Sequence, residues 1–155
     1  MRTLSKKTKY GLQALIALAR KHGEGPVLIA TLAKEEDIPI KFLELILLDL
    51  KNSGILDSKK GPGGGYLLSR PPAKITMGSV IRLMEGPLAP LPCASETAYR
   101  PCEECKDVEC CGIRIVMREV RDAIAEILDC TTLQDVVQKV DAVKRTKDEV
   151  LSYDI

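Results

Sequence analysis

Aromatic residues are scarce in this sequence. They make up 3% of its 155 residues, with a single Phe and no Trp. Proteins that bind single-stranded nucleic acid stack bases on aromatic side chains, so this shortage argues against that class. The chain also lacks an apolar run of the roughly 18 residues that a membrane helix needs, and its first residues, MRTLSKKTKYG, lack the apolar stretch of a signal peptide. We therefore expect a cytoplasmic protein with no membrane contact.

The residue patterns of an enzyme are absent as well. The one histidine, His22, stands at the expected end of a helix, and no nucleophile has a base nearby in the pattern. The glycine run at 61–65 is followed by neither Lys-Ser nor Lys-Thr, and no helix is expected after it, which excludes a nucleotide phosphate loop. We assign His22 no function and expect no enzymatic activity.

Charge is distributed unevenly along the chain, although its net charge is only +1. Residues 1–72 carry 12 Lys and Arg against 7 Asp and Glu, whereas residues 73–155 carry 11 against 15. A basic half joined to an acidic half suggests that the first half meets a polyanion and the second has another role.

A helix is expected over residues 5–22, with Ser5 as its N-cap and Gly23 as its stop. Its first turn contains three lysines, Lys6, Lys7 and Lys9. Positive charge is disfavoured at a helix N-terminus, so these lysines either receive a phosphate there or form an ordinary solvated face.

Two further helices, expected at 28–36 and 40–53 around a turn at 37–39, have helix-turn-helix spacing. The second helix has an apolar stripe of Leu43, Ile46, Leu47 and Leu50. Leu45 and Leu48 fall outside that stripe. We expect them to be additional core, and the alternative is apolar contact with thymine methyl groups.

A β-hairpin wing is expected next, with strands near 55–59 and 66–69 around the glycine run. Backbone N–H groups of glycines such as Gly63 and Gly64 can approach phosphates, and Lys59 and Lys60 add charge beside the turn. Residues 1–72 are therefore predicted to form a winged helix-turn-helix DNA-binding domain.

The second half is expected to be helical around a cysteine-rich loop. A helix at 76–85, capped by Thr76, lies in a linking segment at 73–92, and the loop occupies 93–111. A dimerisation helix and a terminal helix are expected within 112–142, before a flexible tail at 143–155. A capping box, Thr132 with Asp135 or Thr131 with Gln134, starts the terminal helix, which we expect to end near Val140.

The helix that follows the loop has a continuous apolar stripe, formed by Ile113, Val116, Val120, Ile124 and Ile127. This stripe suits either a dimer interface or an intrachain core.

Five of the six cysteines fall within 19 residues: Cys93, Cys102, Cys105, Cys110 and Cys111. In a reducing cytoplasm such a cluster favours metal binding over disulfides. Zinc is one option, because a Cys-x-x-Cys pair with two further thiolates makes a tetrahedral site. Cys130 lies apart, and we expect it to be a small buried hydrophobic residue.

The segments YGLQALIALA, FLELILLDLKNSGIL and KGPGGGYLLSRPP together resemble the Rrf-type winged-helix transcriptional regulators, which are the IscR-, NsrR-, RirA- and CymR-like proteins. The resemblance implies a mainly α fold with a small β-hairpin wing and a long dimerisation helix. It also implies a homodimeric repressor on double-stranded DNA with a palindromic operator, with helix 40–53 in the major groove and the wing in the minor groove. The family's base-reading positions fall on Lys41, Glu44, Leu45 and Lys60, and Leu45 departs from the polar residue expected there.

The same resemblance implies an iron–sulfur cluster, [2Fe–2S] or [4Fe–4S], held by Cys93, Cys105 and Cys111, with Cys102 and Cys110 in reserve. The positions of the family's fourth ligand hold Arg114 and Lys9, and neither suits iron. The leading hypothesis is therefore a regulator that senses iron, cluster, redox or nitric oxide status. The alternatives are a cofactor-free regulator of the cysteine-metabolism type, controlled by a protein partner, and a zinc- or thiol-based regulator.

Overall fold

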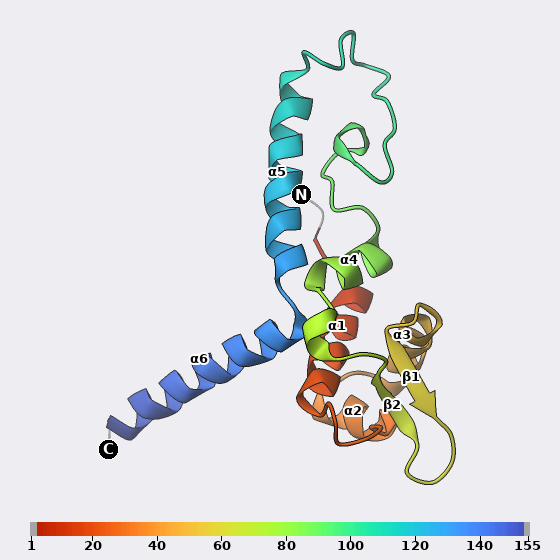
Figure 1. The fold of residues 1–155 in the computed structure, drawn as a ribbon, viewed down its shortest axis with the longest axis vertical. Coiled ribbons are helices and arrows are strands. Elements are labelled where there is room, and N and C mark those ends of the chain that lie inside the picture. Colours follow the sequence, from red (N-terminus) through yellow and green to blue (C-terminus); the bar gives the residue numbers. More distant parts are fainter. Residues whose placement is uncertain (1–2, 154–155) are drawn as a thin grey trace.

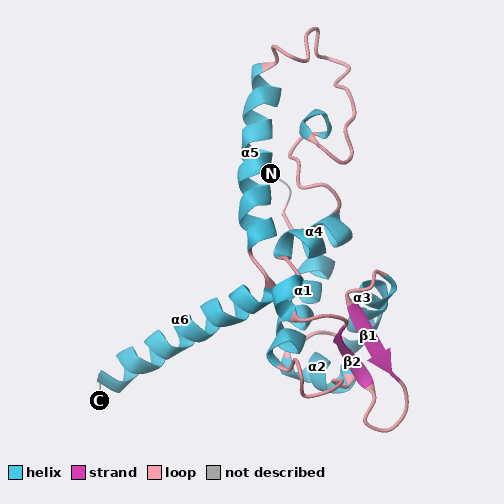
Figure 2. Cartoon of the chain, in the orientation of Figure 1, coloured by secondary structure: helices cyan, strands magenta, loops and turns pink. Residues whose placement is uncertain are grey.

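The computed structural model describes residues 3–153, which form a helical body with a β-hairpin and two projecting helices (Figures 1 and 2). The helices and strands are, in chain order, α1 (Lys6–Arg20), α2 (Ile29–Glu35), α3 (Ile40–Asn52), β1 (Leu56–Lys59), β2 (Gly65–Leu68), α4 (Met77–Glu85), α5 (Gly112–Cys130) and α6 (Leu133–Tyr153). Short 3-10 turns lie at Pro72–Lys74 and Pro92–Ala94. The predicted fold class, mainly α with a small hairpin, is confirmed. Within 3–153, none of the helices is both long enough and apolar enough to cross a membrane.

Helix α1 lies at the centre of the body. The side chain of Ser5 accepts a hydrogen bond from the N–H of Thr8 at 3.1 Å, as predicted for the N-cap. The buried face of α1, which includes Leu12, Leu15 and Leu18, belongs to the single core that α3 and α4 also line. The core therefore sits beneath the helix-turn-helix and holds its helices in place.

Helix α3 buries the predicted stripe completely: Leu43, Ile46, Leu47 and Leu50 are each 0% exposed. Leu45 and Leu48 are 61% and 46% exposed, so the expectation that they are additional core is wrong. The reason is geometric, because the stripe already fills the face that meets α1, and these two leucines point away from it.

The hairpin pairs β1 with β2 in antiparallel register, with Leu56 opposite Leu68 and Lys59 opposite Gly65. Its turn requires glycine at position 64, because a Cβ there would lie 2.3 Å from the carbonyl oxygen of Lys59. The base of the hairpin is joined to the body at Val27, whose N–H donates to the carbonyl oxygen of Tyr66 at 2.8 Å. The predicted wing is present at the predicted place.

Helix α4 braces the start of α1. Thr76 caps α4, as predicted, by accepting from the N–H of Ser79 at 3.2 Å. At the other end, the Glu85 carboxylate accepts hydrogen bonds from the N–H of Ser5 and the hydroxyl of the buried Thr8. The first turn of α1, with its lysines, is therefore held in place by α4.

Helix α5 projects from the body, and Arg121 is the one buried residue along it. At its base, Asp129 accepts two hydrogen bonds from the guanidinium of Arg82 on α4, at 2.5 and 2.8 Å. Cys130 is exposed, so the expectation that it is buried is wrong. It is exposed because it is the last residue of α5, which projects from the body.

Helix α6 begins at the predicted capping box. The Asp135 carboxylate accepts from the N–H and the hydroxyl of Thr132, and the N–H of Asp135 donates to that hydroxyl at 3.1 Å. The helix does not end near Val140 but continues to Tyr153, so residues 143–153 of the expected flexible tail are helical. Residues 154–155 of that tail lie outside the described residues.

Candidate DNA interface and cysteine loop

The outer face of α3 is exposed to solvent. Lys41, Glu44, Leu45 and Leu48 are all exposed along it. With Lys51, which is also exposed and lies three residues after Leu48, the face presents two cations, one carboxylate and two apolar side chains to solvent. A helix with this composition can reach base edges through Lys41 and Glu44 and thymine methyl groups through the leucines.

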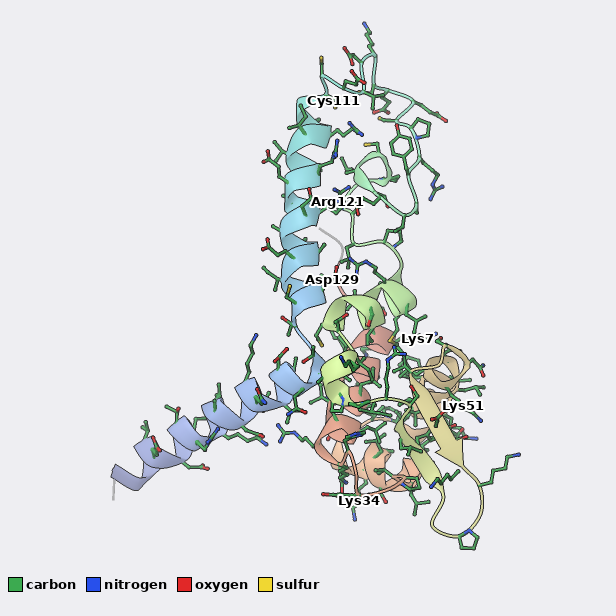
Figure 3. All side chains as sticks on the ribbon, in the orientation of Figure 1. Lys7, Lys34, Lys51, Cys111, Arg121 and Asp129 are labelled. Atoms are coloured by element: carbon green, nitrogen blue, oxygen red, sulfur yellow. The ribbon has the colours of Figure 1, made fainter. Side chains whose placement is uncertain are left out.

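The lysines of α1 fall into two groups. Lys6 and Lys9 are exposed. Lys7, labelled in Figure 3, donates to the Asp49 carboxylate on α3 at 2.5 Å, so its charge is partly neutralised. Lys6 and Lys9 are thus better placed to meet a phosphate than Lys7, which connects α1 to α3.

The wing presents Lys59, Lys60 and Gly63 as exposed residues. Gly64 differs, because it is buried and its N–H donates to the carbonyl oxygen of Gly61 at 2.9 Å. The role of Gly64 is to close the turn, since its backbone donor is already used within the wing.

Cys105 and Cys111 come together where the loop meets α5. The pKa of the Cys111 thiol is lowered, first by the backbone N–H of Arg114 and then by the side chain of Cys105, which favours the thiolate. The pKa of Cys105 is raised, chiefly by its hydrogen bond to Cys111 and to a lesser extent by Cys102. The thiolate form is therefore favoured at Cys111 over Cys105, whose thiol also donates to the carbonyl oxygen of Asp107 at 3.3 Å.

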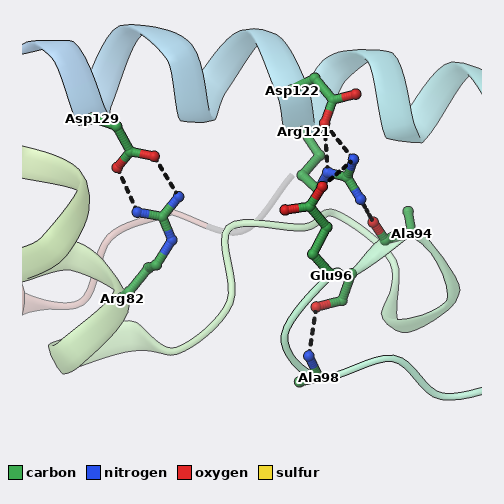
Figure 4. Close-up of polar contacts among 8 residues, drawn as sticks. Arg82, Ala94, Glu96, Ala98, Arg121, Asp122 and Asp129 are labelled. Carbon is green, nitrogen blue, oxygen red and sulfur yellow. Dashed lines mark hydrogen bonds and ion pairs between the residues drawn. The ribbon is translucent and has the colours of Figure 1, made fainter.

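Cys93 is buried in the turn Pro92–Ala94, beside α5. Its carbonyl oxygen accepts from Nε of Arg114 at 2.9 Å. The next carbonyl, that of Ala94, accepts from Nη1 of Arg121 at 2.6 Å (Figure 4). Arg121 also binds Asp122 and Glu96. The two arginines clamp the start of the cysteine loop onto α5.

The sequence alone does not indicate this role for either arginine. Arg114 and Arg121 are seven residues apart, so they lie on one face of the helix that follows the loop. That spacing is the sequence feature from which a shared contact could have been predicted.

The three expected cluster ligands are only partly assembled. Cys105 and Cys111 are in contact, while Cys93 is buried in its own turn and Cys102 and Cys110 are exposed. Across residues 3–153, no three His, Cys, Asp or Glu side chains are grouped closely enough to hold a metal ion.

Comparison with known proteins decides the family. Residues 4–139 match the family model of Rrf2, which is described as an iron-dependent transcriptional regulator. The chain belongs to the Rrf2 family. This confirms the resemblance inferred from the wing and the two helices, and Rrf2 proteins are DNA-binding transcriptional regulators rather than enzymes.

Three relatives show where this Rrf2 chain stands. It is 39% identical to an rrf2-like HTH-type regulator of Rhodobacter capsulatus, over 86% of this chain and 91% of the relative. It is 37% identical to CymR of Bacillus subtilis, over 89% and 91%. The structure of B. subtilis CymR, described as the global cysteine regulator, superposes with a TM-score of 0.75 over 90% of this chain and 98% of CymR. The structure of T. potens IscR is 29% identical, with a TM-score of 0.71 over 90% and 88%.

Proposed function

We propose that this Rrf2 regulator is a homodimeric repressor whose cysteine loop senses iron, redox or nitric oxide status through an iron–sulfur cluster. It binds a palindromic operator, with α3 in the major groove and the wing in the minor groove. The exposed face of α3, with Lys41, Glu44 and Leu45, supports base reading, and Lys60 on the wing supports phosphate contact.

The exposed stripe of α5 supports a dimer. Ile113 and Ile127 are 68% and 67% exposed, and Val116 between them is 50% exposed. A row of large apolar side chains along a projecting helix is costly in water, and it matches what a second copy of the same helix would cover. Ile124 of the same stripe is half-buried by the protomer itself. Two protomers paired through α5 would present two α3 helices to two half-sites.

The contact between Cys105 and Cys111 is the observation that carries the sensor proposal. Thiolates are the usual ligands of iron–sulfur clusters, and the lowered pKa of Cys111 favours the deprotonated form that binds iron. The donor chemistry therefore fits, with Cys105, Cys111 and Cys93 as ligands and Cys102 and Cys110 as reserves. When bound, a cluster supplies a redox-active iron centre.

The protein's own residues connect that site to the dimer helix. Arg114 and Arg121 hold the turn of Cys93 against α5, and Asp129 connects the base of α5 to Arg82 on α4. Ordering the loop through its thiols would therefore act on α5, the helix that sets the separation of the two winged domains.

Two observations favour the cofactor-free alternative, in which a protein partner controls the regulator. The described thiols do not form a three-ligand group, and CymR is at least as similar to this chain as IscR. A zinc-based regulator is the third alternative, because zinc would bind through the same thiolates.

Anaerobic purification followed by visible spectroscopy and by iron, sulfide and zinc assays separates the three. We expect cluster absorbance that is lost in Cys105→Ser and Cys111→Ser and kept in Cys130→Ser. The same spectra of Cys93→Ser, Cys102→Ser and Cys110→Ser identify the remaining ligands. Stoichiometric zinc without iron or sulfide would overturn the cluster, and protein with no metal at all would favour control by a partner.

A further inference from the structure

The end of α6 lies beyond the part of the chain that the Rrf2 family shares. The family match ends at residue 139, whereas α6 runs from Leu133 to Tyr153. Figures 1 and 2 show this helix extending away from the body and from the hairpin. Its last turns therefore lie outside the part of the chain that the family model matches.

A heptad pattern runs along α6. Apolar residues recur at alternating steps of three and four, which is the spacing of a coiled-coil contact face. We call this row the α6 seam; its apolar members are Leu133, Val136, Val140, Val143 and Val150, and Lys147 occupies the remaining position.

The protomer covers only the start of the α6 seam. Leu133 is fully buried, Val140 is 37% exposed, and Val143 and Val150 are each 58% exposed. Valine is a weaker helix former than Ala or Leu, so helix propensity does not explain why valines occupy this row. Valines that recur at heptad spacing on an exposed helix face indicate packing against a second helix.

The charges beside the exposed part of the α6 seam are of one sign. Lys139 and Lys144 occupy the two flanking heptad positions, and Lys147 lies within the seam itself. The acidic residues of the same stretch, Asp141, Asp148 and Glu149, stand at heptad positions outside the seam and its flanks. Asp141 is paired with Arg20 on α1 at 2.6 Å.

A second copy of α6 is a poor occupant of this surface. In a parallel pair, Lys139 of one helix would face Lys144 of the other, because these flanking positions interact across a coiled coil. In an antiparallel pair centred on the exposed stretch, the two Lys144 side chains would meet. Like charges at these positions oppose association.

We propose that the exposed α6 seam, residues 140–150, is a docking surface for an acidic amphipathic helix of a partner protein. Apolar side chains of that helix would cover Val140, Val143 and Val150. Its flanking carboxylates would pair with Lys139 and Lys144, and one seam carboxylate would approach Lys147. This surface is separate from the α5 stripe and from the cysteine loop, so the proposal does not depend on the sensor.

A synthetic peptide tests the surface directly. The probe is a peptide of acidic heptads, with Leu at the seam positions and Glu at both flanks, titrated into the full-length protein by calorimetry. The controls are a peptide with Lys at the flanks and an acidic peptide of scrambled order. The variant Val143→Glu places a charge in the seam, and Ala142→Glu places the same charge on the neighbouring exposed position outside it.

We expect the acidic heptad peptide to bind in preference to both control peptides, with affinity that falls as salt rises. Val143→Glu should weaken binding by at least about tenfold, or about 1.4 kcal/mol, and Ala142→Glu should leave it unchanged. The double variant Lys139→Glu/Lys144→Glu should prefer the lysine peptide. Equal binding of the ordered and scrambled acidic peptides would overturn the proposal. So would self-association of the protein that Val143→Glu abolishes, because the occupant would then be a second copy.

Discussion

Arg114 joins the two ends of the cysteine loop. Its Nε donates to the carbonyl oxygen of Cys93 at 2.9 Å, while its backbone N–H acts on the thiol of Cys111 and lowers the pKa of that group. The first and last cysteines of the loop are thus connected through one residue in the first turn of α5. Arg121, two turns further along, repeats the contact at Ala94.

Arg121→Gln should loosen this clamp. Arg121 is 7% exposed, and its removal leaves the buried carbonyl oxygen of Ala94 without a donor, at a cost of about 1–3 kcal/mol in the free energy of unfolding. Hydrogen exchange of residues 93–98 should become faster. Arg118→Gln, an exposed arginine on the same helix, is the matched control and should change neither quantity. Unchanged exchange in Arg121→Gln would show that the clamp does not order the loop.

Substitutions at Leu45 and Leu47 distinguish an effect on DNA recognition from an effect on folding. Leu47 is 0% exposed, so Leu47→Ala should lower the free energy of unfolding by about 2–5 kcal/mol. Leu45 is 61% exposed, so Leu45→Ala should change it by less than about 0.5 kcal/mol. If Leu45 contacts thymine methyl groups, Leu45→Ala should weaken binding to a selected operator and reduce preference at one base pair. Equal operator affinity in Leu45→Ala and the parent protein would remove Leu45 from the interface.

The first half of the fold could be predicted because its signals are local. Ser5, Thr76 and Thr132 cap helices at the expected positions, and the glycine run can only be a tight turn. The exposure of Leu45 and Leu48 could not be predicted, because periodicity shows which residues share a face but not whether that face is covered.

The second half was harder to predict because its helices α5 and α6 project from the body. Cys130 is exposed since α5 projects, and the sequence carries no direct signal of that projection. The end of α6 was missed because its seam contains Lys147, which interrupts the apolar pattern that marks a helix. The contact of Cys105 with Cys111 joins residues through loop geometry, which spacing alone does not determine.

The pair of Arg82 and Asp129 should make stability depend on pH. The hydrogen bonds from Arg82 hold the pKa of Asp129 below its ordinary value. The contribution of this pair to the free energy of unfolding is therefore fully present above about pH 4, the ordinary pKa range of Asp. It is lost as the pH falls through the lowered pKa of Asp129. Both side chains are about a third or more exposed, so we expect at most about 1 kcal/mol at neutral pH after solvent screening. Thermal melts of Asp129→Asn against the parent protein should show a difference at pH 7 that shrinks towards pH 3, with Asp148→Asn as the control.

Ile127→Glu should separate the protomers without unfolding them. Ile127 is 67% exposed in the protomer, so a charge there costs little within one chain, whereas in an α5 pair it would be buried without a partner. Sedimentation should show a monomer at concentrations where the parent protein is a dimer, with an unchanged circular dichroism spectrum. The affinity for the operator should also fall, because a monomer reaches only one half-site. Arg118→Glu places the same side chain on an exposed position outside the stripe and should remain dimeric. If Ile127→Glu stays a dimer at low concentration, the interface lies elsewhere, and the exposed stripe of α5 must then be assigned to another partner.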